Sequence, residues 1–228
     1  ARSVCVSVHA GLRNLADAPC MPLSGGEPSP YFEWEYKGLN SASDTGWRPA
    51  PLLLEHLRNN HPDLKVLNLD GRGLGDEAAM PLVRALEENT TVTSLRLGRN
   101  QMDEALGALA EILKTNDSVT SVDVRQNDMG AGVAASWAAL LATNATLTDL
   151  NLSSNQIGAS AKDLAEALGK NSTLRTLSVE DCGIEDAAAV LLLEALGGSG
   201  VEEFRGANNR CLEKATRKRL RAWAKTQQ

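Results

Sequence analysis

A glycine-rich turn is the first place in the sequence where residue types and spacing could do chemistry. Residues 66–77 read VLNLDGRGLGDE, an apolar strand that runs into three alternating glycines and then into a helical pattern. Such a turn places backbone N–H groups and a helix N-terminus against the pyrophosphate of a dinucleotide. That fingerprint needs a glycine where Asp76 stands and an acidic residue about twenty positions later. Thr90–Leu97 contains no acid, and only Arg99 would suit a phosphorylated cofactor, so we interpret the turn as structural and expect no cofactor.

Nucleophiles and metal ligands are the second place where chemistry could occur. Neither metal-site spacing nor a visible pairing with Ser, Cys or a carboxylate is found for the three histidines, His9, His56 and His61. Free thiols in a reducing compartment are favoured by the spacing of the four cysteines, Cys5, Cys20, Cys182 and Cys211. The sequence therefore predicts no catalytic residue and no metal, and we do not expect an enzyme.

The elements that must position these residues form a repeat. The pattern Leu-x-x-Leu-x-Leu, with Val, Phe or Gly at some positions, starts at residues 64, 92, 119, 147, 174 and 201, at intervals of 27 or 28 residues. Apolar residues at helical spacing lie between these starts, as in Leu106, Leu109 and Leu113. Eight residues after each start lies Arg72, Asn100, Asn127, Asn155, Cys182 or Asn209. This period predicts a solenoid whose units bury their apolar edges against one another.

Two further features belong to the segments between the strands. The pattern Asn-x-Ser/Thr recurs where four of the helices are expected to end, at Asn89, Asn116, Asn144 and Asn171. We interpret these sequons as a by-product of the turn that ends each helix, and we expect no glycans on them. Trp137 stands where other helices carry Leu or Ala, so we interpret it as a large core residue.

The pattern LxxLxLxxNxL followed by a helix resembles the leucine-rich repeat in its long, ribonuclease-inhibitor-like form, from Leu64 to Cys211. The resemblance implies an α/β leucine-rich-repeat solenoid, with a curved parallel β-sheet on the concave face and helices on the convex face. It also implies a structural ladder of side chains that bond backbone groups of adjacent repeats, formed by Asn100, Asn127, Asn155, Cys182 and Asn209. Arg72 departs from this pattern, so we expect the ladder to end at the first full repeat.

Within this family the chain is similar to the C-terminal domain of tropomodulin, through its short array and the segment NNRCLEKATRKRL at residues 208–220. Tropomodulin caps the pointed ends of actin filaments, so the resemblance implies a non-catalytic protein-binding module of the cytoskeleton. The alternative, from another class, is an activator of GTP hydrolysis like the GTPase-activating protein of Ran. That protein has more repeats and an acidic tail, which this chain lacks.

The repeat boundaries divide the chain into three parts. Residues 1–63 are expected to form an N-terminal segment and a degenerate capping repeat, because Tyr31, Trp34 and Tyr36 fit the leucine register. A free recognition motif is the alternative explanation of these clustered aromatic residues, and Val4, Val6 and Val8 could form one more edge strand. Residues 64–209 are expected to hold six leucine-rich repeats. Residues 210–228 are expected to form a C-terminal capping helix, with a less polar face made of Leu212, Thr216, Leu220 and Trp223.

Charge limits the kinds of partner. The formal net charge is −6, so bulk attraction to nucleic acid or to an anionic membrane is not expected. The apolar stretches are too short to span a bilayer, and no signal-peptide pattern stands at the N-terminus. We therefore expect a cytoplasmic monomer whose partner is another protein.

Basic residues mark two candidate partner-binding surfaces. On the predicted concave face the anchors would be Arg96, Arg99 and Arg125, since interface hot spots favour Trp, Tyr and Arg. On the C-terminal helix a basic stripe contains Lys214, Arg217 and Arg221. The alternative is that both faces are solvated, with the concave arginines neutralised by Asp70 and Asp123.

Overall fold

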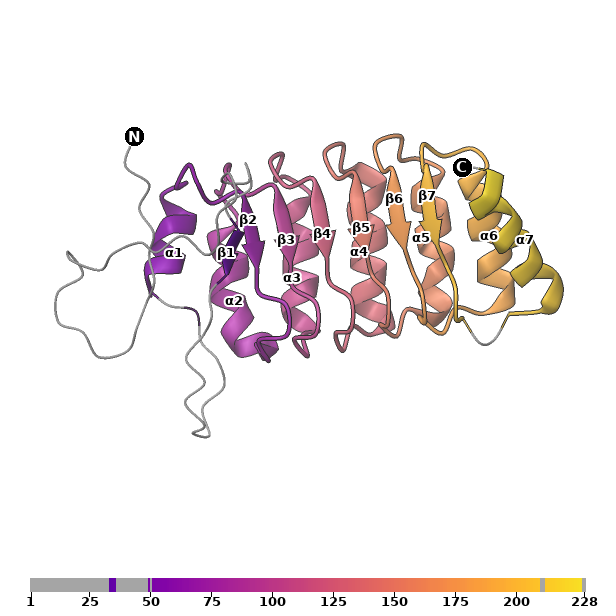
Figure 1. Ribbon diagram of the computed structural model, residues 1–228, viewed down its shortest axis with the longest axis horizontal. Helices are drawn as coiled ribbons and strands as arrows, with labels where there is room; N and C mark the ends of the chain where they lie inside the picture. Colours follow the sequence, from indigo (N-terminus) through magenta and orange to yellow (C-terminus); the bar gives the residue numbers. More distant parts are fainter. Residues whose placement is uncertain (1–32, 36–48, 50, 210–211, 227–228) are drawn as a thin grey trace, which may run out of the picture.

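The computed structural model describes residues 33–35, 49, 51–209 and 212–226. Within them one parallel sheet runs in the order β1 to β7, with the helices behind it (Figure 1). The strands are β1 (Glu33–Glu35), β2 (Val66–Asn68), β3 (Ser94–Arg96), β4 (Ser121–Asp123), β5 (Asp149–Asn151), β6 (Thr176–Ser178) and β7 (Glu203–Arg205). The helices are α1 (Pro51–Arg58), α2 (Gly75–Ala85), α3 (Glu104–Leu113), α4 (Ala131–Thr143), the 3-10 turn η1 (Gly158–Ser160), α5 (Ala161–Leu168), α6 (Asp186–Leu196) and α7 (Lys214–Thr226).

The leucine pattern sets the register of the sheet. The fourth residue of each pattern is the middle residue of a strand, and these residues pair along the sheet as Leu67, Leu95, Val122, Leu150, Leu177 and Phe204. All strand pairs are parallel, so the predicted α/β leucine-rich-repeat solenoid is confirmed. Strand β1 pairs with β2 and sets Trp34 opposite Leu67, the register expected from the aromatic pattern. The predictions for Val4, Val6 and Val8 lie outside the described residues.

The core lies between the sheet and the row of helices. The apolar residues of both layers are buried, and helix α4, which carries no charged residue, contributes the largest of them. Trp137 is 0% exposed, so its interpretation as a core residue is confirmed. Its Nε1 has no hydrogen-bond partner among the described residues. In that part of the chain no helix is long and apolar enough to cross a membrane.

Asn127 shows how one ladder residue connects two repeats. Its Nδ2 donates to the carbonyl oxygens of Leu97, at 3.0 Å in the preceding repeat, and of Val124, at 2.9 Å in its own. Its Oδ1 accepts from the backbone N–H groups of Asn100 and Met102, each at 3.1 Å. The same pairing with the preceding repeat is made by Asn100 and Asn209. The ladder therefore satisfies buried backbone groups that no water reaches.

The sequon asparagines form a second ladder, which sequence reasoning missed. Their side chains are buried, with exposed fractions between 1% and 8%. Asn171 is typical: its Nδ2 donates to Leu141 O at 2.8 Å in the preceding repeat, and its Oδ1 accepts from Leu174 N at 2.8 Å. The recurrence at one position of four repeats was the available signal, since a side chain repeated at the period of a solenoid bonds neighbouring units. The side-chain amide nitrogen to which a glycan would be attached is therefore buried and hydrogen-bonded within the fold.

Cys182 occupies a ladder position with fewer bonding atoms. Its Sγ lies 3.4 Å from Leu152 O and 3.3 Å from Glu180 O, and the residue is 1% exposed. Desolvation by burial raises the pKa of the thiol from 9.0 to about 11. The stability that comes from burying the neutral thiol is therefore complete below pH 9, where both states are protonated, and is lost as the pH rises toward 11.

We predict that Cys182→Asn stabilises the protein by about 1 kcal/mol at pH 7, because an amide adds hydrogen bonds that the thiol cannot make. The advantage should be larger at pH 10, since asparagine has no proton to lose. Urea denaturation of both proteins at the two pH values measures this. A variant that is less stable at pH 7, or a difference that shrinks at pH 10, contradicts the prediction.

Candidate functional site

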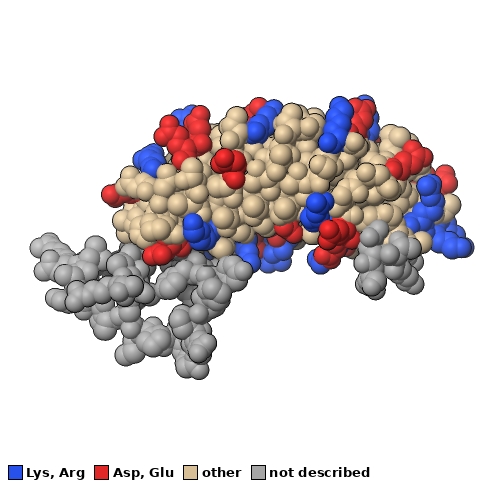
Figure 2. Space-filling view, turned by 90° about the horizontal axis from the view of Figure 1, so that it is seen from above, with Lys and Arg blue, Asp and Glu red and all other residues tan. Residues whose placement is uncertain are grey.

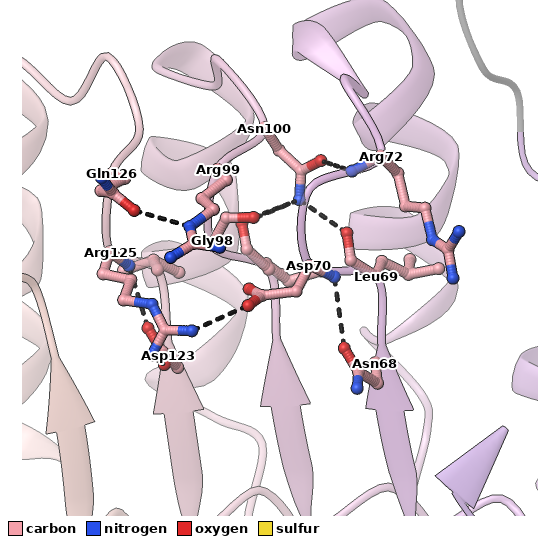
Figure 3. Close-up of polar contacts among 12 residues, drawn as sticks. Asn68, Leu69, Asp70, Arg72, Gly98, Arg99, Asn100, Asp123, Arg125 and Gln126 are labelled. Carbon is pink, nitrogen blue, oxygen red and sulfur yellow. Dashed lines mark hydrogen bonds and ion pairs between the residues drawn. The ribbon is translucent and has the colours of Figure 1, made fainter. Parts of the chain in front are cut away.

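The end of strand β4 and the loops that follow β2 and β4 carry an ion-pair network on the face of the sheet. Arg125 Nη2 lies 2.8 Å from Asp70 Oδ2, and Arg125 Nη1 lies 2.8 Å from Asp123 Oδ2 (Figure 3). The three side chains are between 22% and 37% exposed, so solvent screens these ion pairs only in part. Asp70 and Arg125 belong to the first and third full repeats, so the guanidinium reaches across the whole of the second.

Gly98 is the residue of the second repeat over which Arg125 passes. A Cβ at this position would lie 2.6 Å from Asp70 Oδ1 and 3.1 Å from Arg125 Cγ. Any other side chain would therefore displace one of the two partners. The missing side chain at position 98 is what lets the ion pair form, and sequence reasoning, which noted Asp70 only as a neutralising charge, did not find this.

We predict that Gly98→Ala lowers the free energy of unfolding by about 1 kcal/mol, because the added methyl group forces Asp70 and Arg125 apart. In an Asp70→Ala background the same change should cost clearly less, which a double-mutant cycle measures by urea denaturation. Gly132 of α4, where an added Cβ would meet no atom within 4 Å, is the matched control. Gly132→Ala should stabilise the protein instead, by up to about 1 kcal/mol. Equal costs of Gly98→Ala in the two backgrounds would contradict the role given to Asp70.

The three concave arginines lie on neighbouring repeats, but they differ in what holds them. Arg125 is fixed by two carboxylates, which is the neutralised arrangement that the sequence also allowed. Arg99 is exposed, has a left-handed backbone (φ 59°) and donates from Nε to Gln126 Oε1 at 2.7 Å. Arg96 is exposed on β3. Arg96 and Arg99 are thus more exposed than Arg125.

Helix α7 closes the C-terminal end of the solenoid. Leu212 and Thr216 are buried, and Leu220 and Trp223 pack against the core, with Trp223 edge-on to Phe204 at a centroid distance of 5.9 Å. The N–H of Glu213 donates to Asp186 Oδ1 at 2.8 Å, which fixes the start of the helix to the preceding repeat. The less polar face of α7 is therefore the one that the sequence predicted.

The opposite face of α7 is basic. Lys214 and Arg217 are exposed, whereas the side chain of Arg221 lies outside the described residues. Figure 2 shows Lys and Arg side chains gathered at the end of the solenoid where α7 lies. Helix α7 contains no acidic residue in its first turn. This face and the concave arginines lie at different places along the solenoid.

Cys182, His56 and His61 are described residues of types that often take part in catalysis. The thiol of Cys182 is buried and its raised pKa keeps it protonated near neutral pH, so it is not a nucleophile. His56 and His61 stack at a centroid distance of 4.6 Å, and the pKa of His56 is lowered by burial and by His61. In the described part of the chain no three His, Cys, Asp or Glu residues are grouped as a metal site would require.

Comparison with known proteins places this geometry in a family of repeats. The family model described as Leucine Rich repeat matches residues 143–161 and 170–193, which span the end of α4 to α6. The chain has the fold of a leucine-rich-repeat solenoid. No curated protein matches this sequence significantly.

Solved structures share its architecture. A structure titled leiomodin-1 actin-binding site 2 has a TM-score of 0.57 and 23% identity, over 78% of this chain and 99% of that one. The tropomodulin C-terminal domain of Caenorhabditis elegans has a TM-score of 0.56 and 17% identity, over 64% of this chain and 89% of that one. At these identities the likeness establishes the fold, and it agrees with the resemblance to the tropomodulin C-terminal domain seen in the sequence.

Proposed function

We propose that this leucine-rich-repeat protein is a non-catalytic protein-binding module and that its partner is actin. The observation that carries the proposal is the match to the leiomodin-1 actin-binding site 2, which this chain covers over 99% of its length. The second similar structure is a tropomodulin C-terminal domain, from the family that the sequence resembles. Nothing in the described residues favours the GTPase-activating alternative.

Two basic surfaces are the proposed contact sites. The first is the concave pair Arg96 and Arg99, which is exposed on and just after β3. The second is the basic face of α7, which carries Lys214 and Arg217 and to which the sequence pattern assigns Arg221. Concentrated positive charge on an otherwise acidic chain steers an acidic partner during approach, whereas close contacts on the concave face limit how fast it leaves. Arg125, the third predicted concave anchor, is paired with Asp70 and Asp123, and we propose that it shapes this surface.

Co-sedimentation with filamentous actin and elongation at filament pointed ends test the proposal. We expect saturable binding and slower pointed-end elongation. Reversing Lys214, Arg217 and Arg221 to Glu should slow association and flatten its salt dependence. Changing Arg96 and Arg99 to Ala should mainly speed dissociation. The matched control reverses three exposed basic residues elsewhere, Arg84, Lys162 and Lys170.

The outcomes separate the parts of the proposal. Absence of both co-sedimentation and an effect on elongation rejects actin as the partner. If actin binding is unchanged by both the α7 reversal and the alanine changes at Arg96 and Arg99, the contact site lies elsewhere on the protein. Equal effects of the α7 reversal and of the control reversal would show a general response to net charge.

A further inference from the structure

A cavity of about 660 Å³ opens at the C-terminal end of the solenoid, between the loops after β6 and β7 and helix α7. Its volume lies in the range of about 300–1,000 Å³ that is usual for sites that enclose small groups. We call it the C-terminal cavity. Arg96 and Arg99 do not line this cavity, and none of the sequence motifs predicted it.

The floor of the C-terminal cavity is apolar. Phe204, Leu212 and Leu220 line it, and the first two are 6% exposed. Gly206 also lines it, and a Cβ there would lie 2.5 and 2.7 Å from two ring atoms of Phe204. The absence of a side chain at position 206 therefore leaves the phenyl ring in place and the floor open to a visiting apolar group.

The rim of the cavity on the β6 side is acidic. Glu180 is half-buried and Asp181 is exposed, and neither side chain has a hydrogen bond or ion pair with any other described residue. Arg205 also lines the cavity, but its guanidinium donates twice to Glu203 Oε1, at 2.6 and 2.8 Å, so its charge is matched locally. Arg217 of α7 also stands among the lining residues. The rim of the cavity is thus negative on the β6 side.

We propose that the C-terminal cavity binds a segment of a protein partner in which a lysine or arginine lies beside a bulky apolar residue. The apolar side chain packs on Phe204 and Leu220, and the cation lies between Glu180 and Asp181. The proposal rests on the function of the chain as a protein-binding module, and it does not depend on actin being the partner. Charge complementarity selects the occupant, because an acidic residue at the same place would face two carboxylates.

The test is a titration of the isotope-labelled 228-residue chain with N-acetyl-phenylalanyl-arginine amide, followed by amide chemical shifts in NMR. Saturable shifts are expected at residues 180–181 and 206–208, in the loops that line the cavity. The probe with glutamate in place of arginine should bind at least about fivefold more weakly, since two exposed or half-exposed carboxylates contribute modestly each. Equal binding of the two probes overturns the proposal, and so does the absence of saturable shifts in these loops.

Variants of the rim sharpen the test. Glu180→Gln with Asp181→Asn removes the negative charge and should weaken the arginine probe about fivefold. Asn208 adopts φ 62° at the equivalent loop position of the next repeat, so asparagine suits the φ of 51° at position 181 and the variant should fold. The control, Glu166→Gln with Glu194→Gln, removes two exposed charges from α5 and α6 and should leave binding unchanged. Equal weakening by both variants overturns the proposal. Because actin is absent from this experiment, its failure is distinct from failure of the co-sedimentation test.

Discussion

Replacing Asn127 with alanine is expected to lower the free energy of unfolding by about 3 kcal/mol, because buried backbone groups lose hydrogen-bond partners. The change removes an acceptor from the N–H groups of Asn100 and Met102 and a donor from the carbonyls of Leu97 and Val124. Each buried group left unpaired costs on the order of 1–3 kcal/mol, and partial entry of water reduces the sum. Urea denaturation followed by circular dichroism measures the loss.

Asn151 provides the control for this experiment. It is half-buried at the end of β5, and its Oδ1 accepts one hydrogen bond, from Ser153 N at 3.1 Å. Asn151→Ala should cost less than about 1 kcal/mol, since water can replace the amide at this position. If Asn127→Ala and Asn151→Ala lower the free energy of unfolding by similar amounts, the ladder hydrogen bonds of Asn127 do not contribute more than those of a half-buried asparagine.

The second large effect is expected at Trp137, where alanine should cost about 4 kcal/mol. The side chain is wholly enclosed between the sheet and the helices, so its removal leaves a void that the flanking repeats fill only in part. Phenylalanine is the matched replacement, because the Nε1 that it lacks makes no hydrogen bond with the described residues. Trp137→Phe should cost less than half as much as the alanine variant. A loss below about 1 kcal/mol for alanine would show that α4 repacks freely.

Much of the fold is predictable from the sequence because its causes are periodic. A leucine at the same position of each repeat must face the same core, so Leu95 and Val122 pair in the register that alignment alone suggests. The same argument identifies α7 as a cap, since its apolar residues fall on one face. The strands are shorter than the pattern, because only its third to fifth residues are paired, while Leu64 turns into the core.

What the sequence does not reveal depends on side-chain geometry between repeats. Asp70 and Arg125 are 55 residues apart, and their contact exists only because Gly98 between them lacks a Cβ. The C-terminal cavity depends on the angle at which α7 docks, which no repeat period encodes. The second asparagine ladder could have been predicted, because Asn144 and Asn171 recur at the repeat period. It was missed because the sequons were explained as a by-product of the turn that ends each helix.

The ion pair that crosses Gly98 has a consequence for how this protein comes apart. In most repeat arrays each unit contacts only the next, so unfolding follows a one-dimensional model with nearest-neighbour terms. Arg125 adds a term between units that are not neighbours. The first three full repeats should therefore unfold together as one cooperative unit. Unfolding from the N-terminal end should then not proceed one repeat at a time through them. In hydrogen exchange the slowest amides of β2, β3 and β4 should share one opening free energy, and Asp70→Ala should split it into separate values.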